Sequence, residues 1–155
     1  MFFSSKMAGV VFKSDTHVLM GYQPHKAMIS GIGGKPNDFE PILHTAFRET
    51  IEELFGVTPT YWLIISMAEM FKNAKTVPNG GYTMFVLSFD DLIKFMFYVE
   101  ASVQTSPYYS QFPQTLDDLL LRRRAPSDAE VTHLALIPLV PDPFHVDQRD
   151  IPLLL

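Results

Sequence analysis

The sequence predicts a mixed α/β domain, because segments with strand character alternate with segments with helix character along one chain of 155 residues. A chain of this length is about the size of one ordinary domain. Its residues are 47% hydrophobic and 19% charged, which is typical of globular proteins. We therefore expect residues 1–155 to form a single domain with one hydrophobic core.

Two strands and a glycine-rich loop are expected at the start of the chain. The β-branched run at residues 7–13 predicts a strand, and the Ser-Asp pair after it predicts a turn into a second strand at 17–23. We expect these two strands to pair as a hairpin. The stretch GIGGKPND at 31–38 has three glycines and a proline, so it predicts a loop whose backbone can approach another group closely.

A helix is expected after this loop. Pro41 suits the first turn of a helix, and Gly56 suits a left-handed stop after the last turn. Between them, residues at helical spacing form one stripe that we expect to be buried, and it consists of Leu43, Ala46, Phe47, Thr50 and Leu54.

Two further strands are expected in the middle of the chain, at residues 61–71 and 81–89. A loop that contains the turn sequence Pro-Asn-Gly-Gly would join them. The second segment is apolar nearly throughout, which is typical of a central strand that is buried on both faces.

The last third of the chain predicts two helices and a strand. Residues 90–101 predict a helix opened by Asp90, and residues 114–125 predict a short helix whose arginines lie at its C-terminal end, where positive charge is favourable. Residues 130–139 predict a strand. The proline-rich segment 138–155 follows as a tail.

Composition and charge exclude several classes of function. The chain has no cysteine, which excludes disulfides, zinc–thiolate sites and cysteine catalysis and fits a reducing compartment. The net charge of -5 argues against unspecific binding to long nucleic acids. No apolar run reaches the roughly 18 residues of a membrane span, and the first residues lack the pattern of a signal peptide. We therefore expect a soluble cytoplasmic protein with no membrane partner.

Three glutamates of the helix predicted between Pro41 and Gly56 are the first candidates for chemistry. Glu49, Glu52 and Glu53 share one helix face about 100° wide. Like charges at this spacing repel one another by a few tenths of a kcal/mol per pair. A divalent cation removes that repulsion, and carboxylate oxygens suit Mg²⁺ or Mn²⁺. The alternative is an ordinary solvated acidic face.

The stretch GKPNDFEPILHTAFRETIEELFGV, residues 34–57, resembles the Nudix box, G-x5-E-x7-R-E-U-x-E-E-x-G-U, where U is a bulky aliphatic residue. Six residues match in identity and spacing: Gly34, Glu40, Arg48, Glu49, Glu52 and Glu53. Two positions differ, because Thr50 replaces the aliphatic residue and Phe55 replaces the glycine. Since Gly56 follows one position late, we expect the last helical turn to be extended by one residue.

This resemblance to the Nudix (MutT-like) hydrolases implies a fold and an activity. The implied fold is an α/β/α sandwich with a mixed central sheet and the box as a loop-helix-loop. The implied activity is metal-dependent hydrolysis of a phosphoanhydride in a nucleoside diphosphate linked to another group X. The cofactor would be Mg²⁺ or Mn²⁺, and the partner a nucleotide-type small molecule.

The resemblance also implies roles for the glutamates of the box. Glu52 and Glu53 would be the principal metal ligands. Glu49 would be a ligand or the base that activates water, so these three residues are the catalytic candidates. Glu40 would contribute through the metal shell.

The resemblance implies further site residues, both inside the box and outside it. The carbonyl of Gly34 would add a metal ligand, and Arg48 would hold a glutamate by a bidentate pair. Glu130, before the last strand, is a candidate to complete the metal set, and Glu69 is a weaker one. Lys35 is a candidate for contacting substrate phosphate.

Two other functions are compatible with the same sequence. The arginine run at 122–124 could contact RNA, as an mRNA cap hydrolase would need, although such a run also suits the C-terminal end of a helix. A catalytically silent Nudix-fold protein would keep the fold for binding alone. Several aromatic residues could stack on a nucleobase, although most should be core: Tyr22, Phe71, Tyr82, Tyr108, Tyr109 and Phe112.

Overall fold

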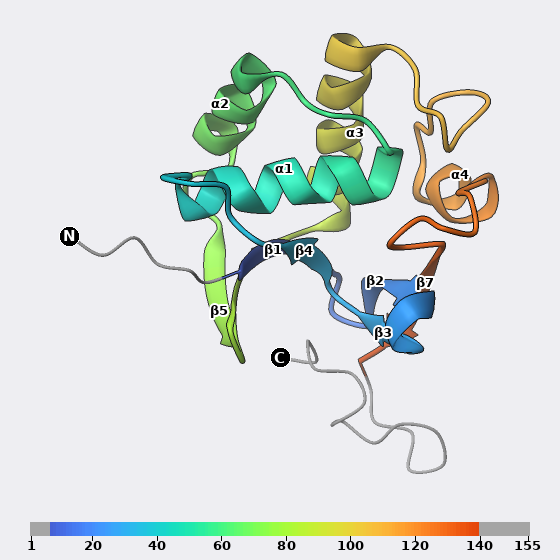
Figure 1. Ribbon diagram of the computed structural model, residues 1–155, viewed down its shortest axis with the longest axis horizontal. Helices are drawn as coiled ribbons and strands as arrows, with labels where there is room; N and C mark the ends of the chain where they lie inside the picture. The colour runs from blue at the N-terminus through green and yellow to red at the C-terminus, as the bar shows by residue number, and fades with distance from the viewer. Residues whose placement is uncertain (1–6, 140–155) are drawn as a thin grey trace.

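Strands and helices alternate along the computed structural model of this chain, which describes residues 7–139 (Figure 1). In chain order the elements are β1 (Met7–Phe12), β2 (His17–Gln23), the short 3-10 helix η1 (Pro24–Lys26), β3 (Met28–Ser30), β4 (Ile32–Gly34), α1 (Ile42–Phe55), α2 (Tyr61–Met70), β5 (Lys75–Asn79), β6 (Tyr82–Leu87), α3 (Phe89–Val103), α4 (Leu116–Leu121) and β7 (His133–Pro138).

The strands within residues 7–139 form two sheets. One has four strands in the order β4-β1-β6-β5, and the other has three in the order β3-β2-β7. Strands β1 and β6 run parallel, and the other neighbouring pairs run antiparallel. The sheet is therefore mixed, which confirms the predicted mixed α/β class.

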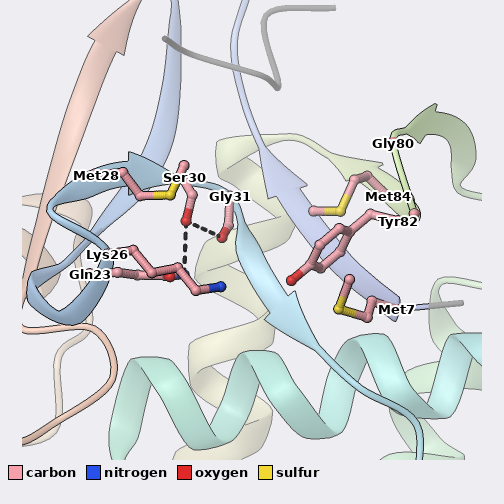
Figure 2. A pocket seen from close by; sticks show the side chains of 10 residues that line it. Met7, Gln23, Lys26, Met28, Ser30, Gly31, Gly80, Tyr82 and Met84 are labelled. Carbon is pink, nitrogen blue, oxygen red and sulfur yellow. Dashed lines mark hydrogen bonds between the residues drawn. The ribbon is translucent and has the colours of Figure 1, made fainter.

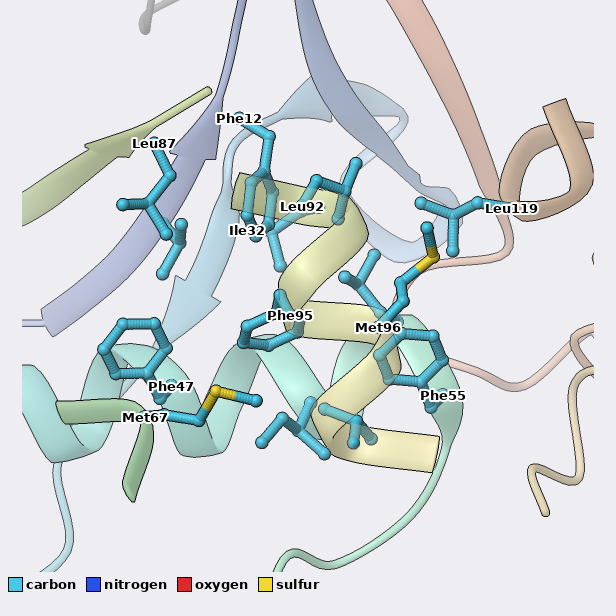
Figure 3. Packing of buried hydrophobic residues seen from close by; sticks show 14 of the residues in the cluster. Phe12, Ile32, Phe47, Phe55, Met67, Leu87, Leu92, Phe95, Met96 and Leu119 are labelled. Carbon is cyan, nitrogen blue, oxygen red and sulfur yellow. The ribbon is translucent and has the colours of Figure 1, made fainter. Parts of the chain in front are cut away.

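Helix α1 lies across β1 and β4, with α2 and α3 beside it (Figure 1). Alternate residues of β1, namely Ala8, Val10 and Phe12, pack into the main hydrophobic core together with side chains from all four α-helices (Figure 3). Val11 points to the other face of the sheet, into a smaller cluster with residues of β2 and β6. The box helix is thus fixed on the core side of the sheet.

The predicted hairpin of residues 7–13 and 17–23 is wrong, although both segments are strands. A single bridge joins Lys13 and Val18 across the turn, but β1 and β2 themselves belong to different sheets. Both edges of β1 are already paired, with β4 on one side and β6 on the other. No edge of β1 is left for β2.

The predicted strand at 61–71 is also wrong, because these residues form α2. The Thr60 side chain caps this helix by accepting a hydrogen bond from the backbone N–H of Leu63 at 3.2 Å. The buried residues of α2 follow helical spacing: Leu63, Ile64, Met67 and Ala68. The second strand of that predicted pair is β6, and its partner on this side is β5, which lies in the segment expected to be a loop.

The glycine-rich loop predicted at 31–38 contains a strand, β4, that pairs with β1. The two backbones approach so closely that a Cβ atom on Gly33 would lie 2.5 Å from the carbonyl oxygen of Ala8. Only glycine fits there, so the prediction of a close backbone approach is confirmed, while the absence of a regular element is not.

The remaining elements agree with the sequence predictions. Helix α3 covers the whole of 90–101 and extends to Val103, helix α4 forms within 114–125, and strands form within 81–89 and 130–139. Strand β6 is central, between β1 and β5, although several of its residues are only half-buried. Helix α3 begins one residue earlier than predicted, because Ser88 and not Asp90 caps it. Most of the predicted tail, residues 140–155, lies outside the described residues.

No helix within residues 7–139 combines the length and the apolar character that crossing a membrane requires. The proposal that residues 1–155 form one domain stays a prediction.

Candidate functional site

The box begins at the end of β4, where Gly34 lies against the helix face that carries Glu49. A Cβ atom on Gly34 would lie 2.4 Å from the carboxyl carbon of Glu49, and 2.4 Å from its Oε2. The missing side chain of Gly34 therefore leaves the space in which this carboxylate sits. Helix α1 packs along β4, which explains why these two residues, fifteen apart in sequence, meet.

Arg48 is the centre of an ion-pair network on α1. Its Nε and Nη2 donate to the two carboxylate oxygens of Glu40 at 2.8 and 3.0 Å, and its Nη1 donates to Glu49 at 3.0 Å and Glu52 at 3.2 Å. Nη2 also donates to the backbone carbonyl of Lys35 at 2.8 Å. One guanidinium thus joins the loop before the helix to three of the four box glutamates.

Glu40 has its oxygens fully engaged. In addition to Arg48, Oε1 accepts from the Thr45 hydroxyl at 2.7 Å and from the Asn37 backbone N–H at 3.0 Å. Burial alone would raise the pKa of Glu40, but these hydrogen bonds and the charge of Arg48 outweigh it and lower that pKa to about 2. Glu40 therefore holds the entry loop on the helix, and direct metal coordination would require it to exchange these bonds.

Glu53 differs from the other box glutamates because it is buried, with 6% of its surface exposed. Its Oε2 accepts a hydrogen bond from the backbone N–H of Gly33 at 3.1 Å, and its Oε1 is buried with no hydrogen-bond partner. Burial raises the pKa of Glu53 well above its ordinary value, and the carboxylates of Glu130 and Glu49 raise it further. A bound cation would stabilise a buried carboxylate that has an oxygen without a hydrogen-bond partner and like charges around it.

Glu49 and Glu130 stand close enough to Glu53 to affect it. Burial raises the pKa of Glu49; Arg48 lowers it again in part, and Glu52 and Glu130 add to the rise. Glu130 lies in the exposed turn before β7, far from the box in sequence. The charge of Glu130 therefore acts on both Glu49 and Glu53, whereas the carboxylate of Glu52 is more exposed and pairs with Arg48.

The donor set fits a hard divalent cation, although the side chains are not arranged around one. Within residues 7–139, no three acidic or histidine side chains stand close enough together to hold a metal ion. Arg48 accounts for part of this, since it occupies oxygens of Glu49 and Glu52. The free oxygen of Glu53 and the space left by Gly34 are nevertheless what a cation with oxygen ligands would use.

The two departures from the box are accommodated in the structure. Thr50 is fully buried, and its hydroxyl donates to the carbonyl of Ala46 at 2.6 Å, so no polar group is left unpaired. Helix α1 continues through Phe55, and Gly56 then ends it in the left-handed conformation with φ of 65°. The predicted extension of the last turn by one residue is confirmed.

In its box residues and their arrangement, the chain resembles the Nudix hydrolases. Comparison with solved structures finds a MutT Nudix hydrolase from Burkholderia pseudomallei, at 14% identity and a TM-score of 0.42, with 93% of this chain and 90% of that chain covered. It also finds a Nudix family hydrolase from Clostridium perfringens, at 13% identity and a TM-score of 0.41, with 89% and 83% covered.

A mutator MutT protein from Bacillus halodurans is similar at 15% identity and a TM-score of 0.32, with 84% of this chain and 95% of that chain covered. No model of a protein family matches the sequence, and no curated protein matches it. Similarity of this degree does not establish an activity, so the function proposed below is argued from the box residues and their geometry.

A pocket of about 280 Å³ lies between β3 and β6 (Figure 2). Tyr82 and Met84 of β6 and Met7 of β1 line one side, and Gln23, Lys26, Met28 and Ser30 line the other. Ser30 and Gly31 of the lining lead directly into β4, where the backbone N–H of Gly33 donates to Glu53. Burial raises the pKa of Tyr82, and the charges of Glu53, Glu130 and Glu49 raise it further.

The polar wall of this pocket is pre-arranged. Gln23 is buried, and its Nε2 donates to the Ser30 hydroxyl at 2.8 Å, which in turn donates to the carbonyl of Gly31 at 3.2 Å. With Met7, Met28 and Met84, the lining combines an apolar surface with a fixed amide, which is typical of small-molecule sites.

The remaining candidates from the sequence lie elsewhere. Glu69 is on α2, largely exposed and paired only with Lys72 among the contacts described, so it is a surface residue away from the box. Lys35 is exposed, and it contributes its backbone carbonyl to Arg48. Most of the aromatic candidates are core residues, and Tyr82 is the one that lines the pocket.

Sequence reasoning missed Gln23, Lys26 and Ser30, because they come from strand ends and a 3-10 turn that carry no motif. It also missed Arg123 as a buried residue. The sequence predicts for the run at 122–124 either a contact with RNA or a place at the C-terminal end of a helix; in the structure the run follows α4, with Arg122 and Arg124 exposed and Arg123 buried. No local signal distinguishes the middle arginine from its neighbours.

Proposed function

We propose that this chain is a divalent-metal-dependent pyrophosphohydrolase that cleaves a phosphoanhydride in a nucleoside diphosphate linked to a group X. The observation that carries the proposal is Glu53, a buried carboxylate with an unpartnered oxygen, beside Glu49 and Glu130. The match of six box residues in identity and spacing supports it. Mg²⁺ and Mn²⁺ are the cations that this oxygen-only donor set favours.

The ligands would come from three parts of the chain. Glu53 would bind through its free Oε1, Glu52 through its more exposed carboxylate, and Gly34 through its backbone carbonyl. Glu130 would complete the set from the turn before β7. A bound divalent cation would supply positive charge for the diphosphate oxygens and would lower the pKa of a coordinated water.

Glu49 suits the role of base. Its Oε1 accepts from Arg48, which leaves Oε2, on the side of Gly34, to take the proton of the attacking water. Its raised pKa makes that proton transfer more favourable than for an ordinary glutamate. Arg48 would orient Glu49 and Glu52 and hold the entry loop through Glu40, without touching the substrate.

The pocket between β3 and β6 would hold the organic part of the substrate. Its methionines and Tyr82 offer an apolar surface, and Gln23 offers an amide at a fixed position. Lys26 lines the pocket and is exposed, and Lys35 is also exposed. The positive charges of these two lysines suit the phosphates of a substrate. A nucleoside group of the substrate would therefore lie between β3 and β6, with its diphosphate directed to Glu53.

The test is hydrolysis of a panel of nucleoside triphosphates, nucleotide sugars, dinucleotides and capped RNA, with Mg²⁺ or Mn²⁺, in which the nucleotide products are separated by chromatography. We expect turnover of at least one nucleotide, loss of that turnover in Glu53→Gln, and unchanged turnover in Glu69→Gln, whose carboxylate is exposed on α2. Failure to hydrolyse any member of the panel would overturn the proposal in favour of a silent binding protein. Cleavage of capped RNA alone, with activity falling steeply with salt, would favour decapping.

A further inference from the structure

The last four carbonyls of α1 all have donors, although a helix leaves these carbonyls without intrahelical partners of its own. The carbonyl of Glu52 accepts from the N–H of Gly56 at 2.8 Å. The carbonyl of Phe55 accepts from the Ser106 hydroxyl. The two carbonyls between them, of Glu53 and Leu54, accept from a single side chain, the guanidinium of Arg123.

Arg123 is buried, with 7% of its surface exposed, and the same guanidinium reaches a second segment. Its Nη2, which donates to the Glu53 carbonyl at 2.7 Å, also donates to the Val131 carbonyl at 2.8 Å, and its Nε donates to the Thr132 carbonyl at 3.4 Å. The ring of Tyr108 lies 4.9 Å from its Cζ. One planar group therefore joins the end of the box helix to the two residues that follow Glu130.

No hydrogen bond or ion pair described for residues 7–139 joins Glu53 directly to Glu130, so the hydrogen bonds of Arg123 are what connects the two segments. The like charges of Glu53 and Glu130 repel, and no carboxylate forms an ion pair with Arg123 among the contacts described for residues 7–139. The positive charge of Arg123 acts on Glu53 from the backbone side, where a cation also suits the helix C-terminus. The guanidinium fork fixes two backbones at once, which the single ammonium of a lysine cannot do.

We propose that Arg123 is a positioning residue that sets the distance between Glu53 and Glu130, and so builds the binding site for a divalent cation. This inference rests on the proposed function. It assigns the middle arginine of the run at 122–124 to the metal centre through backbone carbonyls, whereas its neighbours stay at the surface.

The test is the affinity for Mn²⁺ alone, measured from the paramagnetic resonance signal of free Mn²⁺ during titration of the full chain. We expect Arg123→Lys and Arg123→Met to weaken Mn²⁺ binding by about 10-fold or more, the usual cost of removing a group that orients a metal ligand. Arg122→Met, which removes an exposed arginine paired with Asp118, should leave it unchanged.

Ser106→Ala is the control for helix-end stability. It removes a donor from the same end of α1 but does not touch residues 131–132. Even if urea unfolding shows that Ser106→Ala loses as much stability as the Arg123 variants, we expect it to bind Mn²⁺ with an affinity within twofold of the wild type. We also expect Glu130→Gln to weaken binding in the wild type and to add little in Arg123→Lys, since the two changes act on one arrangement.

Each outcome decides the proposal. Folded Arg123 variants that bind Mn²⁺ as the wild type does would overturn it, and so would a Ser106→Ala variant weakened to the same degree. If neither Arg123 variant folds, the proposal is also overturned, because Arg123 would then serve the whole fold and not the metal centre. A wild type that does not bind Mn²⁺ would instead overturn the proposed function.

Discussion

Glu53→Gln should stabilise the metal-free protein while it abolishes metal binding. In the metal-free state the wild type buries a carboxylate whose Oε1 has no partner and whose neighbours are Glu49 and Glu130. An unsatisfied buried polar group costs about 1–3 kcal/mol. The cost is larger when the group is charged. Glutamine keeps the Oε atom that accepts from Gly33 while it removes the buried charge and its repulsion from Glu49 and Glu130, so the variant should be the more stable protein.

The magnitude can be expressed as a melting temperature. For a domain of this size, 1 kcal/mol corresponds to about 2–4 °C, so Glu53→Gln should melt roughly 2–10 °C above the wild type in EDTA at pH 8. The assay is thermal unfolding followed by circular dichroism, with Glu69→Gln as the control. That variant removes an exposed glutamate paired with Lys72 and should change the melting temperature little.

The difference should depend on pH, and its sign follows from the raised pKa of Glu53. The folded protein binds this proton more tightly than the unfolded chain, so the wild type loses stability as the pH rises from the ordinary glutamate value, 4.5, through the folded pKa. The two proteins should therefore be closest in stability below pH 4.5 and furthest apart at high pH.

Metal reverses the order. Mn²⁺ at about 100 times its dissociation constant should stabilise the wild type by about 2.7 kcal/mol and leave Glu53→Gln unchanged. The reasoning is refuted if Glu53→Gln is less stable than the wild type in EDTA at pH 8, or if Mn²⁺ raises the melting temperature of both proteins equally.

Three further predictions concern the groups around Glu53. Glu40→Gln should lower the free energy of unfolding by about 1–3 kcal/mol at pH 7 and by much less at pH 2. The lowered pKa of Glu40 contributes stability above pH 4.5, and this stability is lost as the pH falls to about 2. Urea unfolding at the two pH values measures the difference, and equal losses at both would contradict the prediction. Gly34→Ala should weaken Mn²⁺ binding at least 10-fold, because the new Cβ would displace the Glu49 carboxylate. Gly81→Ala is the control and should not weaken it, since its Cβ would have no heavy atom nearer than 3.7 Å. Titration calorimetry compares the two variants, and equal affinities would show that Mn²⁺ binding does not use the space at Gly34. Gln23→Leu should raise the KM of the hydrolysed nucleotide about 10-fold, the equivalent of about 1.4 kcal/mol, with Mn²⁺ affinity unchanged; a fall in kcat alone would place Gln23 outside the pocket that holds the organic group.

The box could be predicted from the sequence because its chemistry is local. Glu49, Glu52 and Glu53 share a helix face by spacing alone, and Gly34 and Glu40 lie one short loop before them. The helix stop at Gly56 was equally local, since it needs only a residue that tolerates a positive φ.

Segment 61–71 was assigned to the wrong class because a continuous apolar run does not distinguish a buried helix from a buried strand. In the structure the segment is a helix, and the Thr60 side chain, just before the apolar run, caps it. The hairpin of the first two strands failed for a different reason, since pairing of β1 with β4 and β6 is a tertiary choice that no local turn signal contains.

The parts of the site that lie far apart in sequence could not be predicted. Arg123 is 70 residues from Glu53, and its neighbours in the arginine run are exposed, so its burial depends on how α4 and the following turn fold against α1. Glu130 was a candidate only through the family resemblance. The pocket combines Gln23 and Ser30 with Tyr82 from another sheet, a combination that only the assembled fold creates.

Anomalous X-ray diffraction from a crystal soaked in Mn²⁺ would show where the cation binds. We expect a manganese peak bonded to Oε1 of Glu53, at about 2.0–2.3 Å, with Glu49, Glu52 or Glu130 and the Gly34 carbonyl among its other neighbours. A crystal with manganese bound elsewhere and none at Glu53 would contradict the proposed metal site.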